Sequence, residues 1–202
     1  MIIGLTGTYC AGKNFIAEIL EKRGLPVLDV DKLGHQVLEI EKKTIFEKFG
    51  NDLQRSDGTL DRRLLGQKIY GNPEKLAELE AIVHPKANQL TEEWAAGRDR
   101  AGDRACVINA ALLHRSTLFH KLDRVIIVTA PFLTRLFRAK RRDRLSWREL
   151  LKRFAAQKDF STQYLSINAE IYKVENLGLS KRSLSNSRKI ERKIDAIIGG
   201  IR

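Results

Sequence analysis

Eight residues near the start of the chain have the types and the spacing that phosphate chemistry requires. They are Gly7, Thr8, Tyr9, Cys10, Ala11, Gly12, Lys13 and Asn14. Gly7 and Gly12 permit backbone angles that a Cβ would forbid, so consecutive N–H groups can turn inward around an anion. Lys13 adds a mobile positive charge, and a helix that starts near Asn14 points its positive end at the same anion. The stretch, here called the phosphate loop, predicts a nucleotide site.

The last position of the phosphate loop departs from the usual pattern. Ser or Thr normally follows the lysine, because its hydroxyl binds Mg²⁺, and this chain has Asn14. An amide oxygen can ligate a hard cation, although it lies one bond further out. We therefore predict a Mg²⁺ ligand at Asn14 with an altered geometry. The alternative is a glycine turn that only joins the apolar residues 1–5 to a helix.

Two acidic residues stand at the end of a short segment that is typical of a strand. Residues 27–31 read Val-Leu-Asp-Val-Asp. Ligands of open parallel sheets gather beyond the carboxyl ends of the strands, so we expect Asp29 and Asp31 on the side of the phosphate loop. A carboxylate there accepts a proton from an attacking hydroxyl or holds Mg²⁺. The alternative for Asp31 is the N-cap of a helix over residues 32–49.

The other elements alternate between helix and strand, which predicts an α/β fold with a parallel sheet and right-handed crossovers. Residues 105–108 and 125–129 read as buried strands. Residues 60–96 read as helical, with breaks at 71–73 and at His84-Pro85, and a charged loop follows at 97–103. A tail helix from Leu184 carries isoleucines at helical spacing and is expected to pack on the core.

Length and composition favour one soluble domain over residues 1–202. The chain has 43% hydrophobic and 31% charged residues, and it contains no apolar run of the roughly 20 residues that a membrane helix needs. It also enters its first strand without a signal peptide, so we expect a cytoplasmic protein with no membrane partner. Cys10 and Cys106 have no metal-ligand spacing and are read as reduced thiols. The alternative for Cys10 is a pKa lowered by the N–H dipoles of the loop, which would make it oxidisable.

Positive charge is concentrated in one stretch. Nine Lys or Arg residues lie between Arg135 and Arg153 against Asp143 and Glu149, which accounts for +7 of the net +12. Apolar residues at helical spacing predict two helices with a basic turn at 141–145. Such a hairpin, here called the lid and bounded at 133–157, can close over a bound nucleotide. The alternatives are a surface for a nucleic-acid backbone and a solvated pair of basic helices.

The order of these features resembles the dephospho-coenzyme A kinase family, whose members phosphorylate the ribose 3′-hydroxyl of dephospho-coenzyme A. The similarity covers nearly the whole chain. Its motifs are residues 4–7 before the loop, Val27–Asp31 with Gln36-Val37, 57–63, Ile82-Val83-His84-Pro85, Arg142-Asp143 before Leu145-Ser146, 155–157, and 174–178. The acid pair, the His-Pro and the Arg-Asp in this order are far more specific than the phosphate loop alone.

The resemblance implies a P-loop kinase-like sheet with ATP and Mg²⁺ as cofactors. It makes Asp31 the base that takes the ribose proton, with Lys13 and Arg142 as the other catalytic residues. The phosphate loop, Arg138 and Asn176 would bind ATP, with Asn176 at the adenine. The helical insertion at 60–96 would receive dephospho-coenzyme A through Arg62, Arg63, His84 and Pro85. No nucleic-acid partner is expected.

Two departures keep other functions open. The family's loop usually reads Gly-Gly-Ile-Gly-Ser-Gly-Lys-Ser, and Arg115 stands where an acid is usual after strand 105–108. Loss of that acid together with the hydroxyl at Asn14 favours a degenerate nucleotide-binding protein with little or no kinase activity, whose basic lid binds nucleic acid or a regulatory nucleotide. A nucleoside or nucleotide kinase is a further alternative, against which the His-Pro and the motif at 57–63 argue.

Overall fold

A computed structural model describes residues 1–143, 145–155, 164, 167–178 and 184–200. The chain divides into two compact units. The first unit comprises Met1–Leu28 with Trp94–Arg202, and the second comprises Asp29–Glu93. The second unit therefore begins well before the predicted insertion at 60–96. Within the described residues, none of the helices is long and apolar enough to cross a membrane.

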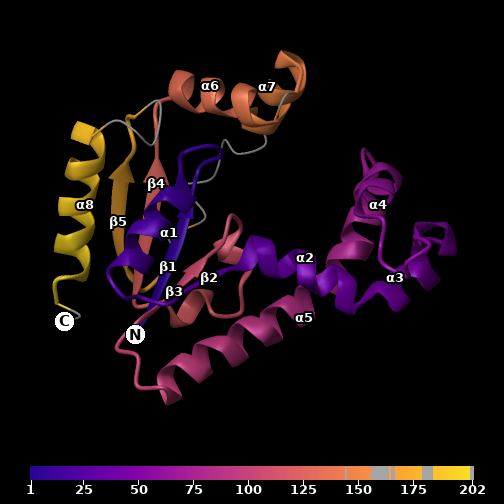
Figure 1. Cartoon of the computed structure of the whole chain (residues 1–202), viewed down its shortest axis with the longest axis horizontal. Coiled ribbons are helices and arrows are strands. Elements are labelled where there is room, and N and C mark those ends of the chain that lie inside the picture. Colours follow the sequence, from indigo (N-terminus) through magenta and orange to yellow (C-terminus); the bar gives the residue numbers. More distant parts are fainter. Residues whose placement is uncertain (144, 156–163, 165–166, 179–183, 201–202) are drawn as a thin grey trace. The chain divides into compact units, whose positions relative to one another are not determined.

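Five strands form one sheet in the order β2-β3-β1-β4-β5 (Figure 1). Their bounds are β1 Ile2–Gly7, β2 Val27–Asp29, β3 Cys106–Asn109, β4 Arg124–Thr129 and β5 Glu170–Glu175. β1 pairs in parallel with β3 and β4, and β4 pairs in parallel with β5. This arrangement confirms the predicted α/β fold and puts β1, which leads into the phosphate loop, in the middle of the sheet.

Helices α1 (Lys13–Lys22) and α8 (Leu184–Ile198) cover the sheet of the first unit. Figure 1 shows α8 alongside β5. Their apolar faces share one buried cluster with the strands, which includes Ile3, Leu5, Ile16, Leu20, Val107, Ile126, Val128, Val174, Ile190 and Ile194. The prediction that the tail helix packs on the core is confirmed, because the isoleucine stripe of α8 lies in this cluster.

The first unit also contains the predicted lid helices, α6 (Phe132–Asp143) and α7 (Trp147–Ala155). They confirm the expected helical hairpin, while residues 144, 156 and 157 of the lid lie outside the described residues. Two short 3₁₀ turns, η2 (Leu113–Arg115) and η3 (Phe119–Lys121), connect β3 to β4.

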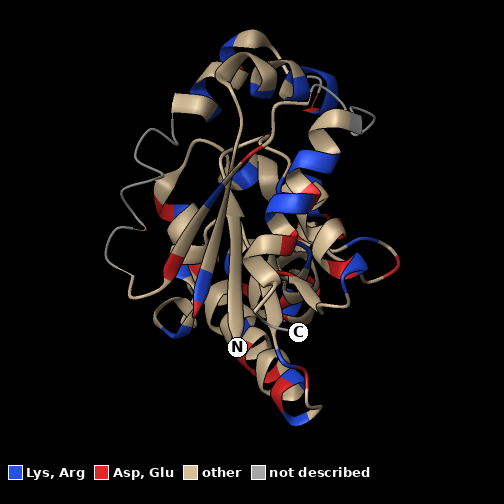
Figure 2. Cartoon of the chain, turned by 90° about the vertical axis from the view of Figure 1, so that its left-hand side faces the viewer, with Lys and Arg blue, Asp and Glu red and all other residues tan. Residues whose placement is uncertain are grey.

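The strand β5 was not predicted from the sequence. It lies at the edge of the sheet, and of its six residues only Val174 is buried. Figure 2 shows charged residues along β5 and along the outer side of α8. An edge strand with charged side chains lacks the apolar pattern of a buried strand, and charge on an edge also prevents pairing with another chain. Its pairing with β4 is therefore a tertiary feature that local pattern does not reveal.

The second unit is helical, with bounds α2 Val30–Ile40, α3 Lys42–Phe49, η1 Asn51–Leu53, α4 Arg62–Ile69 and the first part of α5 Pro73–Arg100. Its core contains Ile45, Phe46, Leu53, Leu60, Leu65 and Leu79. The single helix expected over 32–49 is wrong, because Glu41 separates α2 from α3. The strand β2 also ends at Asp29, two residues earlier than expected. The side chain of Asp29 caps α2 by accepting from the Lys32 N–H at 3.1 Å, so the alternative that Asp31 is the N-cap is wrong as well.

Helix α5 corrects two further predictions. Pro85 lies inside it and does not break it, since proline removes a single backbone hydrogen bond and the helix continues for several turns on both sides. The helix also runs through residues 97–100, which were expected to form a loop. It ends where Gly102 adopts φ +80° and the N–H of Asp103 bonds to the carbonyl of Arg98. Arg98 and Arg100 in its last turn favour this longer helix, because cations stabilise a helix C-terminus.

Candidate functional site

The phosphate loop joins β1 directly to α1, as predicted. The N–H of Thr8 donates to the carbonyl of Val128 at 3.2 Å, and the N–H of Ala11 donates to the carbonyl of Thr8 at 2.9 Å. Gly7 is required by close approach, because a Cβ there would lie 2.6 Å from the Val128 carbonyl oxygen. Gly12 is required by conformation, since it adopts φ +97° as the N-cap of α1. A Cβ on Gly12 would also collide with the side-chain amide of Asn176. Gly7 is therefore required by space alone, and Gly12 by both space and conformation.

Lys13 and Asn14 are the first two residues of α1. Lys13 is half-buried and Asn14 is exposed. The first turn of the helix contains no acidic residue. The first turn therefore adds no negative charge of its own at the positive end of the helix dipole, which suits a phosphate.

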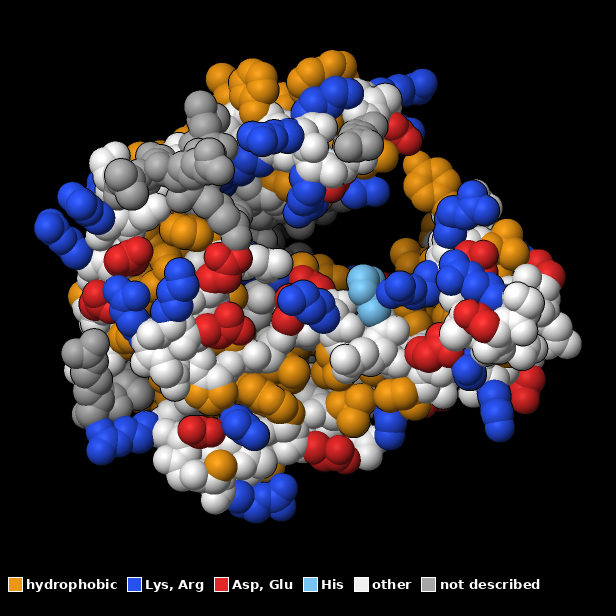
Figure 3. All heavy atoms as spheres, in the orientation of Figure 1, with side chains coloured by type: hydrophobic (Ala, Val, Ile, Leu, Met, Phe, Trp, Pro, Cys, Tyr) orange, Lys and Arg blue, Asp and Glu red, His pale blue; other side chains and the backbone are white. Residues whose placement is uncertain are grey.

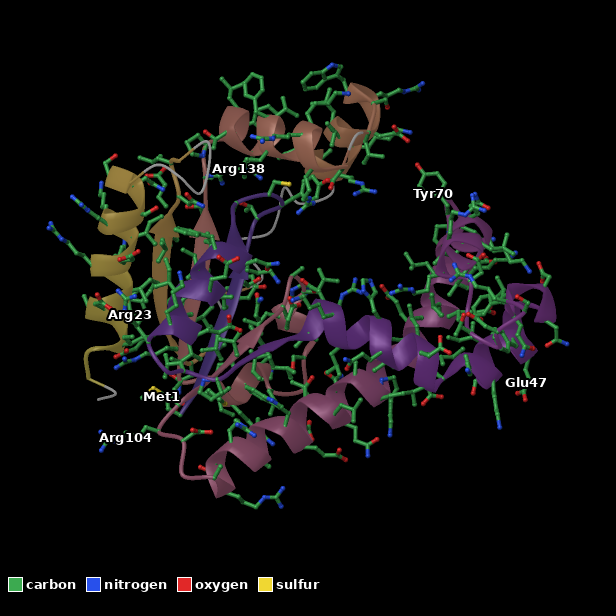
Figure 4. All side chains as sticks on the ribbon, in the orientation of Figure 1. Met1, Arg23, Glu47, Tyr70, Arg104 and Arg138 are labelled. Carbon is green, nitrogen blue, oxygen red and sulfur yellow. The ribbon has the colours of Figure 1, made fainter. Side chains whose placement is uncertain are left out.

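The side chain of Arg138, on α6, holds the phosphate loop by bonding to backbone carbonyls of the loop. One guanidinium nitrogen donates to the carbonyls of Cys10 at 3.2 Å and Ala11 at 2.9 Å. The other donates to the carbonyls of Asn176 at 3.1 Å and of Gly178. Figure 4 shows Arg138 on the side of α6 that faces the loop. Four carbonyls on two separate segments thus share one side chain.

Asn176 supports the same loop from the end of β5. The residue is 6% exposed, and its side chain donates to the Ala11 carbonyl at 3.0 Å. Its amide oxygen accepts from the side chain of Asn186 at 3.0 Å. Both polar ends of Asn176 therefore bond to protein groups. Contacts of Asn176 with adenine and of Arg138 with phosphate stay predictions.

Arg142 lies beside the loop in a charged cluster at the end of α6. Its guanidinium donates to both carboxylate oxygens of Asp143, at 2.6 and 3.1 Å. Arg153 of α7 lies 3.8 Å from the same carboxylate. The side chain of Tyr9 donates its hydroxyl proton to Asp143. The hydrogen bond from Arg142 is the main cause that lowers the pKa of Asp143, while burial raises the pKa of Tyr9. The carboxylate and the phenol therefore keep opposite roles as acceptor and donor near neutral pH.

The outer side of the lid mixes two kinds of side chain. Figure 3 shows Lys and Arg side chains together with hydrophobic ones over α6 and α7. The exposed apolar residues are Phe132, Leu133, Phe137, Trp147 and Leu151. The inner side instead buries Ala139, Leu150 and Phe154 against Tyr9 and Cys10. The lid therefore rests on the phosphate loop through an apolar contact as well as through charge.

Both cysteines are free thiols, as predicted. Burial raises the pKa of Cys10 and of Cys106. The alternative of an acidic, oxidisable Cys10 is therefore wrong, because the cost of burying a thiolate exceeds the stabilisation from the nearby arginines. Cys10 is instead notable for its backbone, since it adopts φ +59° in the loop.

The remaining candidates lie in the second unit. Asp31 stands exposed in the first turn of α2, and Arg62 and Arg63 are the exposed first residues of α4. His84 is half-buried and Pro85 exposed in the middle of α5. Among the described residues, the side chains of Arg62, Arg63 and His84 make no hydrogen bond or ion pair. They therefore keep their polar atoms available for a ligand.

The side-chain oxygens on the phosphate loop and at the end of β3 suit a cation that is held mainly by phosphate and water. Among the described residues, no three His, Cys, Asp or Glu side chains form a metal cluster. Neutral oxygens are present instead. Asn14 carries an exposed amide, and the hydroxyl of Thr8 and the amide oxygen of Asn109 are buried without a partner in the described part of the chain. Mg²⁺ usually keeps several waters and binds substrate phosphates, so this donor set fits it without a carboxylate cage.

Comparison with known proteins agrees with this geometry. A family profile described as dephospho-CoA kinase matches residues 1–174. The dephospho-CoA kinase of Treponema pallidum is 35% identical over 197 residues, which covers 94% of this chain and 92% of that protein. The dephospho-CoA kinase of Shouchella clausii is 39% identical over 160 residues, with coverages of 78% and 81%. A crystal structure of a Thermus thermophilus protein superposes with a TM-score of 0.77 at 30% identity, and covers 100% of this chain and 98% of that one.

The chain belongs to the dephospho-CoA kinase family. Within this family, ATP is the implied phosphate donor. The structure shows where the two residues that depart from the family's usual sequence lie. Asn14 occupies the second residue of α1, and Arg115 is the exposed last residue of η2. Beside Arg115, burial lowers the pKa of His114, whose ring packs edge-on against Tyr164.

Sequence reasoning missed the roles or positions of three side chains in this dephospho-CoA kinase family member. Asn109 ends β3 opposite Leu5 of β1, and a polar residue that ends an apolar run was a usable signal for it. Asn186 lies on α8, where it reads as an ordinary polar position of an amphipathic helix. Tyr9 was counted in the loop, but its side-chain bond to Asp143 spans 134 residues and has no local signature.

Proposed function

We propose that this chain transfers the terminal phosphate of ATP to the ribose 3′-hydroxyl of dephospho-coenzyme A. The observation that carries the proposal is the strand, phosphate loop and helix at 2–22 in a chain that belongs to the dephospho-CoA kinase family. We also propose that the chain acts in the cytoplasm as one kinase domain, with residues 60–96 as its substrate-binding insertion and 133–157 as its lid.

The groups of the phosphate loop bind the nucleotide. Lys13 and the backbone of residues 10–12 hold the phosphates of ATP, helped by the N-terminus of α1. Arg142 and Arg138 supply positive charge from the lid, and Asn176 contacts adenine. Cationic groups around the transferred phosphate offset the charge on its equatorial oxygens and so lower the barrier.

Asp31 acts as the general base. As the 3′-oxygen forms its bond to the transferred phosphorus, the bond between that phosphorus and the bridging oxygen of ADP breaks. The hydroxyl proton passes to the Asp31 carboxylate. Its exposure in the first turn of α2 supports this role, since an exposed carboxylate is accessible to the hydroxyl of a substrate.

Mg²⁺ is proposed as the metal cofactor, with the amide oxygen of Asn14 as its protein ligand. When bound, it neutralises charge on the ATP phosphates. Arg62, Arg63, His84 and Pro85 are proposed to receive dephospho-coenzyme A. The two arginines stand exposed at the N-terminus of α4, where their cationic side chains suit the diphosphate of that substrate.

The test is an assay of ADP release from ATP and Mg²⁺ with and without dephospho-coenzyme A. We expect turnover that requires dephospho-coenzyme A. Asp31→Asn should lower kcat by about 10²-fold to 10⁴-fold with little change in ATP affinity, because general-base catalysis is lost and the phosphate contacts remain. An unchanged kcat in Asp31→Asn would contradict the assignment of the base.

Asn14→Ser separates the proposal from its main competitor. The departures at Asn14 and Arg115 favour a nucleotide-binding relative without kinase activity. If wild type binds ATP but does not turn over, and Asn14→Ser restores activity, that competitor is correct. Turnover with a nucleoside in place of dephospho-coenzyme A would instead support a nucleoside kinase.

A further inference from the structure

Tyr9 is the residue of the phosphate loop whose hydroxyl reaches the charged end of α6. That hydroxyl donates to one carboxylate oxygen of Asp143. Arg153 of α7 donates to the Tyr9 hydroxyl oxygen at 3.4 Å. The phenol therefore bonds to the last residue of one lid helix and to a side chain of the other.

The ring of Tyr9 also contacts residues of the lid. It packs edge-on against Phe154 of α7, with ring centroids 5.2 Å apart and planes at 72°. The Arg142 guanidinium carbon lies 5.2 Å from the centroid of the same ring, within the range of a cation–π interaction. Two lid residues, one apolar and one cationic, thus contact Tyr9 on the ring alone.

Asp143 links this contact to the predicted catalytic arginine. Its carboxylate is 16% exposed and accepts from two nitrogens of Arg142. A guanidinium has five N–H donors in a fixed plane, so a carboxylate that accepts from two of them fixes the direction of the remaining donors. The hydroxyl of Tyr9 bonds to that carboxylate, and the ring of Tyr9 lies against that guanidinium. It therefore restrains both members of the Arg142–Asp143 pair.

We propose that Tyr9 is a positioning residue that fastens the lid to the phosphate loop and, through Asp143, orients Arg142 for phosphoryl transfer. The orienting part rests on the proposed kinase function, whereas the fastening part is independent of it. The inference concerns the hydroxyl as well as the ring. A residue that only filled space against Phe154 would do so equally well as phenylalanine.

The decisive variant is Tyr9→Phe, which keeps the ring and removes the hydroxyl. We expect kcat to fall about tenfold with a smaller change in the KM for dephospho-coenzyme A, because one hydrogen bond to a charged group is lost and Arg142 acts on the transferred phosphate. Asp143→Asn should give a similar loss. The double variant should lose no more than Asp143→Asn alone, since the hydroxyl acts through that carboxylate.

Tyr172→Phe is the matched control. Tyr172 also donates its hydroxyl to a carboxylate, that of Glu170 at 2.7 Å, but it lies on the edge strand β5. The same chemical change there should leave kcat unaltered. Equal losses in Tyr9→Phe and Tyr172→Phe, or a double variant whose losses multiply, would overturn the orienting role.

Limited digestion with trypsin tests the fastening without any activity. Lys and Arg residues throughout the lid are cleavage sites, and cleavage requires local opening. Without nucleotide, Tyr9→Phe should be cut several-fold faster within residues 133–153 than wild type or Tyr172→Phe. Equal cleavage rates would overturn the fastening. If wild type lacks kinase activity but Tyr9→Phe is still cut faster in the lid, the proposed function fails and the fastening stands.

Discussion

The phosphate loop and the second unit are organised in opposite ways. Around the loop, the bonds join residues far apart in sequence: Arg138 to Ala11 across 127 positions, and Asn176 to Ala11 across 165. In the second unit, many side-chain bonds are local caps, such as Asp61 to the N–H of Leu64 and Asn72 to that of Lys75. The geometry of the loop therefore depends on distant elements, whereas the predicted substrate residues are held by the helices that carry them.

The largest contrast is expected from two glycine substitutions. Gly7→Ala places a Cβ 2.6 Å from the Val128 carbonyl oxygen, so the loop must move away from β4. We expect about a hundredfold loss of kcat/KM, since displacement by about 1 Å is enough to cost that much. Loss of thermal stabilisation by ATP is the second measurement.

Gly34→Ala is the matched change in the second unit. A Cβ at Gly34 has nothing within 4 Å, and the residue lies inside α2. Alanine should raise stability by about 0.5–1 kcal/mol because the unfolded chain loses freedom. The contrast between the loop and the second unit is contradicted if Gly7→Ala binds ATP normally, or if Gly34→Ala lowers kcat/KM as much as Gly7→Ala does.

A smaller effect is expected from Arg138→Lys. An ammonium group keeps the charge but does not reproduce a planar fork that reaches four carbonyls. We expect the KM for ATP to rise about tenfold, by analogy with the loss of hydrogen bonds to a charged group. Isothermal titration with ATP measures the same loss directly.

Arg23→Lys is the control for that change. Arg23 pairs with Asp195 at 2.9 Å and lies after the C-terminus of α1, away from the loop (Figure 4). ATP binding should be unchanged in this variant. If Arg138→Lys also binds ATP normally, the loop does not depend on its distant clamp.

The smallest effect is expected at the cap of α4. The side chain of Asp61 accepts from the N–H groups of Arg63 at 3.0 Å and Leu64 at 2.9 Å. Asp61→Ala should lower the melting temperature by a few degrees at pH 7, a typical cost for a lost cap. Asp61→Asn keeps the cap and should lose less.

The same residue predicts a pH dependence. The bond from the Leu64 N–H is the main cause that lowers the pKa of Asp61, and Arg55 adds to it. A lowered folded pKa means that the carboxylate stabilises the fold above its unfolded value of 3.8, and that this stabilisation disappears as the pH falls through the folded value. The difference in melting temperature between wild type and Asp61→Ala should therefore shrink below about pH 4. A constant difference would contradict the assigned cause.

Features that depend on neighbouring residues could be predicted from the amino-acid sequence. The strand, phosphate loop and helix at 2–22 follow from an apolar run, two glycines and an amphipathic pattern. The lid helices and the isoleucine stripe of α8 follow from helical periodicity in the same way. These signals are local because hydrogen bonds within a helix and the conformational limits of glycine involve residues close together in the chain.

Features that depend on residues far apart in the chain became visible only in the folded structure. β5 is a strand because it pairs with β4, although its side chains are mostly exposed. Pro85 is helical because the turns on both sides continue through it. Arg138, Asn176 and Tyr9 act on the loop and lid through partners more than 100 positions away, and side-chain chemistry alone does not identify which partner a donor will meet. Chain folding supplies that information, since it brings distant acceptors within hydrogen-bond reach of these side chains.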